Sequence, residues 1–156
     1  MEHLGFVGLG VMGEPMCRNL ARKSGVPVVG YDLSPEPLGR LAADGVRAAR
    51  SAAEALDQAA VLFLSLPSGA EVEAVCEAEG LVARAKSGQT IVDLGTSPVA
   101  LARRLCARFA EKGAAFADAP VARTREAAIA GTLSIMVGAD DATFRRIAPL
   151  DRKSTV

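Results

Sequence analysis

The chain has little with which to build a metal centre, a disulfide framework or a nucleic-acid surface. It contains one histidine and three scattered cysteines, Cys17, Cys76 and Cys106, without the paired spacing of metal ligands. Each cysteine falls in a helical pattern, so we expect reduced thiols that serve as small apolar fillers. Lysine plus arginine number 18, as do aspartate plus glutamate, and this balance favours neither nucleic acid nor anionic lipid as a partner.

Long apolar runs are also missing. The longest, 59–66, is far too short to span a bilayer. The amino terminus, with Glu2 and His3, does not resemble a signal peptide. We therefore expect a cytoplasmic protein that does not enter a membrane. Half of the 156 residues are hydrophobic, which is enough to bury the core of one domain.

Short apolar runs alternate with amphipathic stretches along the chain. Strands are predicted over 4–8, 27–31, 47–48, 60–67, 89–96 and 114–121, with a seventh inside 131–140. Helices are predicted over 11–23, between Ser34 and Gly45, and over 51–59, 69–88 (one or two helices), 98–113 and 140–148. The alternation predicts an α/β fold with a doubly wound, mostly parallel sheet and helices on both faces. We expect one domain over 1–150 and a polar tail over 151–156.

Three glycines near the amino terminus, Gly8, Gly10 and Gly13, have the spacing G-x-G-x-x-G. Alone this spacing is a weak signal, because glycine is common in strand-to-helix turns. Here it ends a predicted strand and begins a predicted helix within a unit of about thirty residues. Gly8 would allow the tight turn, Gly10 the close approach of a pyrophosphate, and Gly13 the packing of helix on strand. The context predicts a dinucleotide-binding site in a Rossmann-like fold.

An acidic residue, Asp32, stands at the end of the second predicted strand. A carboxylate there can accept hydrogen bonds from the adenosine ribose hydroxyls and would repel a 2′-phosphate. The next residue is Leu33 rather than an arginine, so the pair favours NAD over NADP. Taken alone, Asp32 could equally be a turn residue ahead of a helix cap at Ser34.

Two later loops follow the predicted fourth and fifth strands: "SLPSG" over 65–69 and "DLGTSP" over 93–98. Open α/β sheets bind their ligands at the carboxyl ends of the strands. However, Pro67 could simply end a strand, and the run from Thr96 to Pro98 could simply cap a helix. Spacing alone leaves contact with the cofactor and a structural role equally open for both loops.

The segments "GFVGLGVMGEPMCRNL", "LPSG", "DLGTSP" and "DAPVARTREAAIAGTLSIMVGAD", in this order, resemble the amino-terminal domain of the β-hydroxyacid dehydrogenase family, the 3-hydroxyisobutyrate dehydrogenases and tartronate semialdehyde reductases among them. The resemblance implies hydride transfer between NAD and a small 3-hydroxy acid or its semialdehyde, in a homo-oligomer. It also implies a set of cofactor-binding residues: Gly8, Leu9, Gly10, Val11, Met12, Gly13, Asp32, Leu66, Pro67 and Thr96.

The chain departs from the family after "DAPV". The family usually has Ser-Gly-Gly there, a loop thought to bind the carboxylate end of the substrate, whereas this chain has Ala122, Arg123 and Thr124. A guanidinium can bind a carboxylate or phosphate through two hydrogen bonds. We therefore expect these three residues to contact substrate and Arg123 to alter the substrate preference. A surface arginine at the start of a helix is the alternative.

A second departure concerns catalysis. The family's acid/base lysine lies in a G-x-G-x-x-x-K-x-x-N motif that follows this domain and precedes an all-helical carboxy-terminal domain. Neither is present here, and Lys153 lacks the surrounding motif. We assign no catalytic residue and expect a truncated dehydrogenase that binds cofactor but turns over little. The alternative is a stand-alone, non-catalytic dinucleotide-binding or regulatory module.

Overall fold

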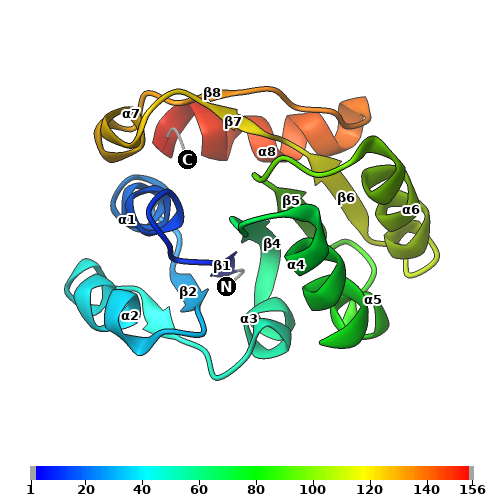
Figure 1. Ribbon diagram of the computed structural model, residues 1–156, viewed down its shortest axis with the longest axis horizontal. Helices are drawn as coiled ribbons and strands as arrows, with labels where there is room; N and C mark the ends of the chain where they lie inside the picture. The colour runs from blue at the N-terminus through cyan, green and yellow to red at the C-terminus, as the bar shows by residue number, and fades with distance from the viewer. Residues whose placement is uncertain (1–2, 155–156) are drawn as a thin grey trace.

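A six-stranded parallel sheet forms the centre of the computed structural model, which describes residues 3–154 (Figure 1). The strand order is β3-β2-β1-β4-β5-β6, and each neighbouring pair is parallel. The strands are β1 (His3–Val7), β2 (Val28–Tyr31), β3 (Arg47–Ala48), β4 (Ala59–Leu64), β5 (Thr90–Asp93) and β6 (Ala115–Asp118). The order reverses between β1 and β4, so a crevice is expected beyond their carboxyl ends.

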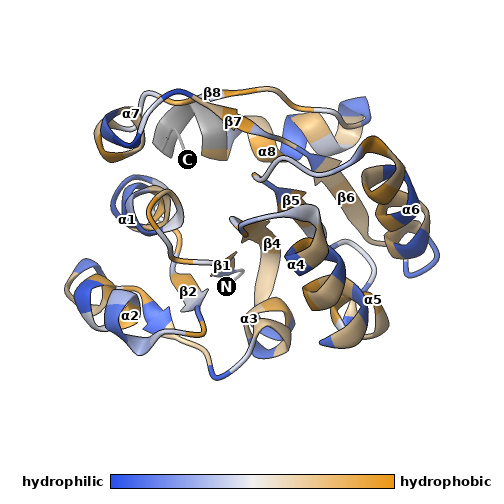
Figure 2. Cartoon of the chain, viewed as in Figure 1, coloured by the Kyte–Doolittle hydropathy of each residue, from blue (hydrophilic) through white to orange (hydrophobic). Residues whose placement is uncertain are grey.

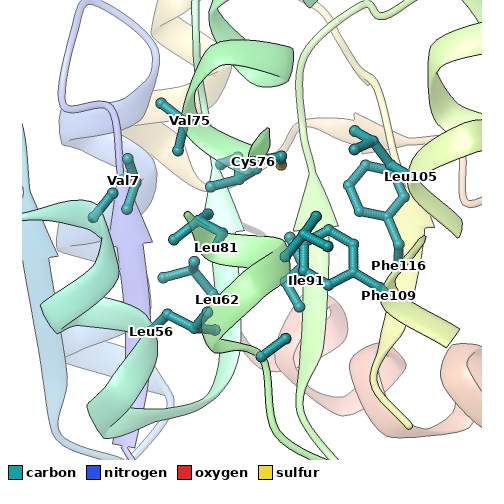
Figure 3. Close-up of a cluster of buried hydrophobic side chains, with 14 of the residues drawn as sticks. Val7, Leu56, Leu62, Val75, Cys76, Leu81, Ile91, Leu105, Phe109 and Phe116 are labelled. Atoms are coloured by element: carbon teal, nitrogen blue, oxygen red, sulfur yellow. The ribbon is translucent and has the colours of Figure 1, made fainter. Parts of the chain in front are cut away.

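Successive side chains of every strand of this sheet except the exposed β3 enter two different apolar layers, as a sheet covered on both faces requires. In β1, Phe6 belongs to one layer and Val7 to the other. The layer of Val7, drawn in Figure 3, packs under α3 (Ala52–Gln58), α4 (Gly69–Glu73), α5 (Leu81–Arg84) and α6 (Val99–Ala110). The layer of Phe6 packs against α1 (Gly13–Lys23), α2 (Pro35–Leu41), α7 (Arg125–Ala130) and α8 (Asp141–Ser154).

Hydropathy follows the same plan. Figure 2 shows the central strand β4 coloured as hydrophobic, while the helices around the sheet mix hydrophobic and hydrophilic residues. Among residues 3–154, no helix combines the length and the apolar character needed to cross a membrane. The predicted doubly wound α/β fold with helices on both faces is confirmed.

The carboxy-terminal part of the fold differs from the prediction. The predicted strand 114–121 is two strands, because Pro120 lacks the N–H that a continuous ladder needs. After β6 the chain starts again as β7 (Val121–Ala122), which pairs antiparallel with β8 (Ser134–Ile135) in a separate two-stranded sheet. The strand predicted inside 131–140 is therefore found as β8 in this second sheet, and Gly138 of the same segment makes one antiparallel bridge with Asp118 of β6.

Two helical stretches also differ from their predicted bounds. The helix predicted from Val11 begins at Gly13, since the glycine loop occupies the residues before it. The stretch 69–88 contains α4, a π-helical turn η2 (Ala74–Ala78) and α5, with Gly80 at a φ of 87° before α5. By contrast, the helix predicted between Ser34 and Gly45 is confirmed, since α2 follows Ser34 and the short 3-10 turn η1 (Ala42–Asp44) extends it to Gly45.

The last helix, α8, was predicted to end near Ala148. It instead passes through Pro149 and ends at Ser154, inside the predicted polar tail. A proline removes one helical hydrogen bond, but the apolar contacts continue on both sides of it. Ile147 is buried and Leu150 packs half-buried against the same layer as Phe6. Residues 155–156 of the predicted tail lie outside the described part of the chain, and so does the side chain of Lys153.

The cysteine prediction is right in part. All three cysteines are free thiols, and Cys17 and Cys76 are buried as apolar fillers. Burial raises the pKa of the Cys76 thiol to about 12, so this thiol stays protonated and unreactive at neutral pH. Cys106 is exposed, and its Sγ donates to the carbonyl oxygen of Phe116 at 3.2 Å. The prediction of a buried filler is therefore wrong for Cys106.

Candidate dinucleotide site

The glycine loop follows β1 and leads into α1, and each of its glycines meets a different constraint. Gly8 has a φ of 90°, and a Cβ there would lie 2.2 Å from the carbonyl oxygen of Ser65. A Cβ at Gly13 would lie 1.9 Å from the carbonyl oxygen of Gly8. A Cβ at Gly10 would meet no atom within 4 Å. Gly8 and Gly13 are thus required by the fold, whereas the surface at Gly10 is open for a ligand to approach.

A cavity of about 630 Å³ opens beside this loop, at the carboxyl edge of the sheet. Its size falls in the range of small-molecule and cofactor sites, roughly 300–1,000 Å³. It brings together most of the residues predicted to bind the cofactor: Gly8, Gly10, Val11, Met12, Gly13, Asp32, Leu66, Pro67 and Thr96. Leu9 is the exception, because its side chain is only 1% exposed and belongs to the core.

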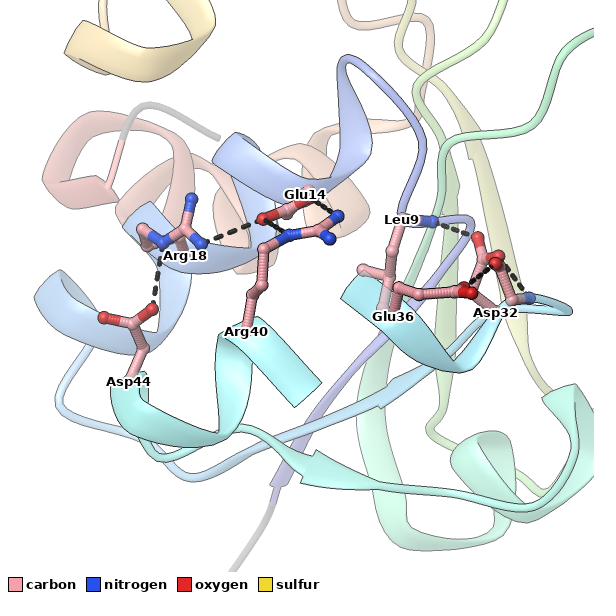
Figure 4. A network of polar contacts seen from close by, with 8 residues as sticks. Leu9, Glu14, Arg18, Asp32, Glu36, Arg40 and Asp44 are labelled. Carbon is pink, nitrogen blue, oxygen red and sulfur yellow. Dashed lines mark hydrogen bonds and ion pairs between the residues drawn. The ribbon is translucent and has the colours of Figure 1, made fainter. Parts of the chain in front are cut away.

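Leu9 and Asp32 are nevertheless joined through the backbone. The N–H of Leu9 donates to Oδ2 of Asp32 at 2.6 Å, and the N–H of Ser34 donates to Oδ1 at 2.8 Å (Figure 4). Asp32 therefore ties the end of β2 to the glycine loop. Its carboxylate is half-buried on the cavity wall and accepts only one hydrogen bond at each oxygen among the described contacts. Each oxygen retains capacity for a further donor such as a ribose hydroxyl.

An ion-pair network anchors α2, the helix that follows Asp32, onto α1 (Figure 4). Glu14 pairs with Arg40 at 2.7 Å and with Arg18 at 2.9 Å, and Arg18 pairs with Asp44 at 2.9 Å. Hydrogen bonding from Arg40, then from Arg18, holds the pKa of Glu14 below its usual value despite partial burial. The arginines thus compensate the negative charge of Glu14, the only acidic residue in the first turn of α1. The positive end of the helix dipole therefore remains available to an anion.

On the other side of the cavity, the loop after β5 is fixed by a buried carboxylate. Oδ1 of Asp93 accepts from the N–H of Gly95 at 2.9 Å, and Oδ2 accepts from Oγ of Ser97 at 2.6 Å. These two bonds hold Thr96 at the cavity wall. Asp93 was missed as a positioning residue, although an aspartate two residues before a glycine is a recognisable turn pattern.

The residues predicted to contact substrate lie beside the cavity rather than on its wall. Val121, the residue before them, lines the cavity. Ala122 ends β7, Arg123 is exposed with a φ of 97°, and Thr124 caps α7 by accepting from the N–H of Ala127 at 3.4 Å. Arg123 is thus at a helix start, the position that the alternative interpretation expects.

A family model described as the NAD binding domain of 6-phosphogluconate dehydrogenase matches residues 3–153, nearly the whole chain. The chain belongs to this family. Such a match agrees with the glycine loop, the strand order and the position of the cavity. It confirms that the chain is a dinucleotide-binding domain of the oxidoreductase type that the sequence motifs predicted.

Three relatives resemble this NAD-binding domain over nearly its whole length. The 2-(hydroxymethyl)glutarate dehydrogenase of Eubacterium barkeri is 38% identical over 94% of this chain and 49% of that protein. The 2-hydroxy-3-oxopropionate reductase of Escherichia coli is 38% identical over 94% of this chain and 50% of that protein. The solved 3-hydroxyisobutyrate dehydrogenase of Mycobacterium tuberculosis matches with a TM-score of 0.86 and 39% identity, over 96% and 50%. The chain spans about half the length of these relatives.

The wall of the NAD-binding domain's cavity also contains residues that the sequence motifs did not indicate. They come from two places: the end of β2 and the helical segment after β4. They include Tyr31, Leu33, Glu71, Ala74, Val75 and Glu79, whereas Ser65 belongs to the loop 65–69 that the sequence did indicate. Nothing in the spacing of the segment 69–88 distinguishes these glutamates from their neighbours, since a π-helical turn decides which of them face the cavity.

Proposed function

We propose that this chain is the cofactor-binding domain of an NAD-dependent 3-hydroxyacid dehydrogenase. The observation that carries the proposal is the single cavity on which nearly all of the motif residues meet. A nicotinamide cofactor, when bound, supplies or accepts the hydride. The family membership and the names of the relatives support an oxidoreductase of small hydroxy acids.

The residues of the cavity fit the parts of a dinucleotide. The backbone from Gly8 to Gly13 and the amino terminus of α1 would hold the pyrophosphate, because the first N–H groups of a helix lack intrahelical partners and Gly10 leaves room. Asp32 would accept hydrogen bonds from the adenosine ribose. Leu66 and Pro67 would flank the cofactor, and Thr96 would lie toward the nicotinamide. Each of these residues would therefore bind or orient one part of the cofactor.

The cofactor that we propose is NAD rather than NADP. Asp32 places a carboxylate where the ribose hydroxyls are expected, and the following Leu33 is 89% exposed without offering a cation. A 2′-phosphate at that position would meet negative charge and no guanidinium. Support for NAD therefore comes from the charge of the wall.

A fluorescence titration with NADH tests this proposal on the chain itself. We expect saturable binding, and we expect Gly10→Val to weaken it at least tenfold because the added side chain would fill the open surface. Gly39→Val is the matched control, since a Cβ at Gly39 also meets no atom within 4 Å but lies outside the cavity. If NADH does not bind saturably, the proposed function is wrong.

For the substrate, we propose that Ala122, Arg123 and Thr124 approach the acid group of the 3-hydroxy acid. Arg123 is exposed and lies two residues from the cavity wall at Val121. Its guanidinium suits a carboxylate or phosphate. Arg123→Ala in the complete enzyme should change the ranking of substrates with one and with two acid groups. An unchanged substrate profile would rule out this role.

We further propose that the domain works within a homo-oligomer and is poorly active by itself. Exposed apolar side chains occur on the carboxy-terminal elements, at Ile129, Met136 and Phe144. Exposed apolar surface of this kind favours association. Sedimentation of the chain at high concentration should show species larger than a monomer, and a clean monomer would contradict the proposal.

A further inference from the structure

The helical segment after β4 contains four glutamates in two different environments. Glu73 pairs with Arg104 of α6, and Glu77 pairs with Arg108 of α6 at 3.5 Å. Their charges are therefore neutralised on the side of the segment that faces α6. Glu71 and Glu79 instead line the cavity, and no ion pair to either is found among the described residues.

The π-helical turn η2 places the second of these glutamates. The N–H of Glu79 donates to the carbonyl oxygen of Ala74, five residues earlier, at 2.9 Å. In a regular α-helix, Ala78 would follow Ala74 after one turn. Here Glu79 takes that place, and the cavity wall contains Ala74 and Glu79 but not Ala78. The irregular turn thus brings Glu79 to the cavity wall, where regular helical spacing would bring Ala78.

The described residues of the cavity wall have charge of one sign. The charged side chains are those of Asp32, Glu71 and Glu79, and no lysine, arginine or histidine is among them. The hydroxyl of Ser68, then the backbone N–H of Glu71, hold the pKa of the Glu71 carboxyl below its usual value. Glu71 is therefore ionised at neutral pH. An anion entering the cavity is attracted only by the backbone amides and the helix dipole.

Resting on the proposed function, we propose that Glu71 and Glu79 are specificity-determining residues that act against the 2′-phosphate of NADP. NAD and NADP differ only by that phosphate group. Its negative charge would share one cavity with three carboxylates, and repulsion against the wrong ligand is a general route to specificity. The selection does not rest on Asp32 alone, so neutralising Asp32 leaves the cavity selective for NAD.

The test compares NADH and NADPH on the full chain by fluorescence titration. Glu71→Gln combined with Glu79→Gln should strengthen NADPH binding about tenfold, or roughly threefold for each charge removed, and NADH binding by clearly less. Glu73→Gln combined with Glu77→Gln is the control, because it removes the same charge from the same segment on the side facing α6. In the control the ratio of the two affinities should stay at the wild-type value.

The outcomes separate the two proposals. If NADH binds but the affinity ratio is the same in both double variants, the role of Glu71 and Glu79 is wrong and the proposed function stands. If the wild-type chain binds neither cofactor, the proposed function itself fails. Ionic strength gives an independent measure. Because salt screens exposed charges, raising it should reduce the wild-type preference for NADH, and a preference that salt does not change would overturn the proposal.

Discussion

The two sides of the cavity are built in different ways. On the side of β1 and β2, the backbone itself forms the surface, and steric contacts at Gly8 and Gly13 permit no other residue type. On the side of β7 and α7, the two residues of β7 are half-buried, and Arg123 is exposed in a backbone conformation that favours glycine. Substitutions on the first side therefore meet backbone atoms, whereas an exposed loop side chain on the second side can change at little cost to the fold.

The largest expected effect is a loss of stability on the side of β1 and β2, called the rigid side below. Gly13→Ala would place a Cβ 1.9 Å from the carbonyl oxygen of Gly8, and no side-chain rotation can relieve this contact because the Cβ is fixed by the backbone and the oxygen belongs to it. We expect the free energy of unfolding to fall by about 3 kcal/mol or more. Urea unfolding followed by circular dichroism measures it. Gly10→Ala, where the Cβ meets open space, should unfold like the wild type, and equal losses in both variants would contradict this contrast.

The carboxylate of Asp32 gives the next largest effect. Asp32→Ala removes the acceptor for the N–H groups of Leu9 and Ser34, together with the proposed ribose contact. Hydrogen bonds to a charged group contribute about 1.5–3 kcal/mol each, so NADH affinity should fall roughly ten- to a hundredfold. Glu36→Gln, a neutralised carboxylate on α2 outside the cavity, is the control. Unchanged NADH affinity in Asp32→Ala would show that this carboxylate does not hold the ribose.

On the side of β7 and α7, called the variable side below, a substitution should instead raise stability. Arg123 is the non-glycine residue with positive φ in the described part of the chain, at 97°. Such a conformation costs about 1–3 kcal/mol, part of which glycine returns through its greater freedom when unfolded. Arg123→Gly should therefore raise the free energy of unfolding by about 1 kcal/mol and leave NADH affinity unchanged. Thermal unfolding and the NADH titration together check this, and a less stable variant would contradict the strain.

The smallest expected effect is the dependence of stability on pH, and it concerns Asp118 at the end of β6. Asp118 is the β6 neighbour of Asp93 in β5, and Oδ1 of Asp118 is buried without a hydrogen-bond partner. Burial, and then the charge of Asp93, raise the pKa of Asp118 above its ordinary 3.8. The folded chain therefore holds this proton more tightly than the unfolded chain, so stability falls as pH rises from about 4 through the raised pKa.

Asp118→Asn removes that titration. Relative to the variant, the wild type should lose stability as pH rises through this window, by less than about 1 kcal/mol because the side chain is partly exposed. Urea unfolding of both proteins at a series of pH values gives the difference directly. A wild type that gains stability over the variant as pH rises would show that the carboxylate is stabilised rather than repelled.

The sequence predicts the rigid side well and the variable side poorly, and the reason is physical. Around Gly8 and Asp32, local rules for turns and parallel strands all point to one structure, and β1, the glycine loop, α1 and β2 follow one another as predicted. Around Pro120 the same rules allow a continuous strand, and only the missing N–H breaks it. The position of Glu79 on the cavity wall depends on the hydrogen bond from its N–H to the carbonyl oxygen of Ala74. No residue pattern specifies that hydrogen bond. Asp93 stands two residues before Gly95 in a recognisable turn pattern, but that pattern does not specify the burial that fixes its carboxylate under the loop.

The most direct test of the central claim, that the dinucleotide lies on the glycine loop, is an amide chemical-shift titration of the chain with NAD by nuclear magnetic resonance. The account predicts that the largest shifts occur at Gly8, Gly10, Met12 and Asp32, with small shifts at Arg123. Shifts concentrated on β7 and α7, or no saturable shifts at all, would contradict it.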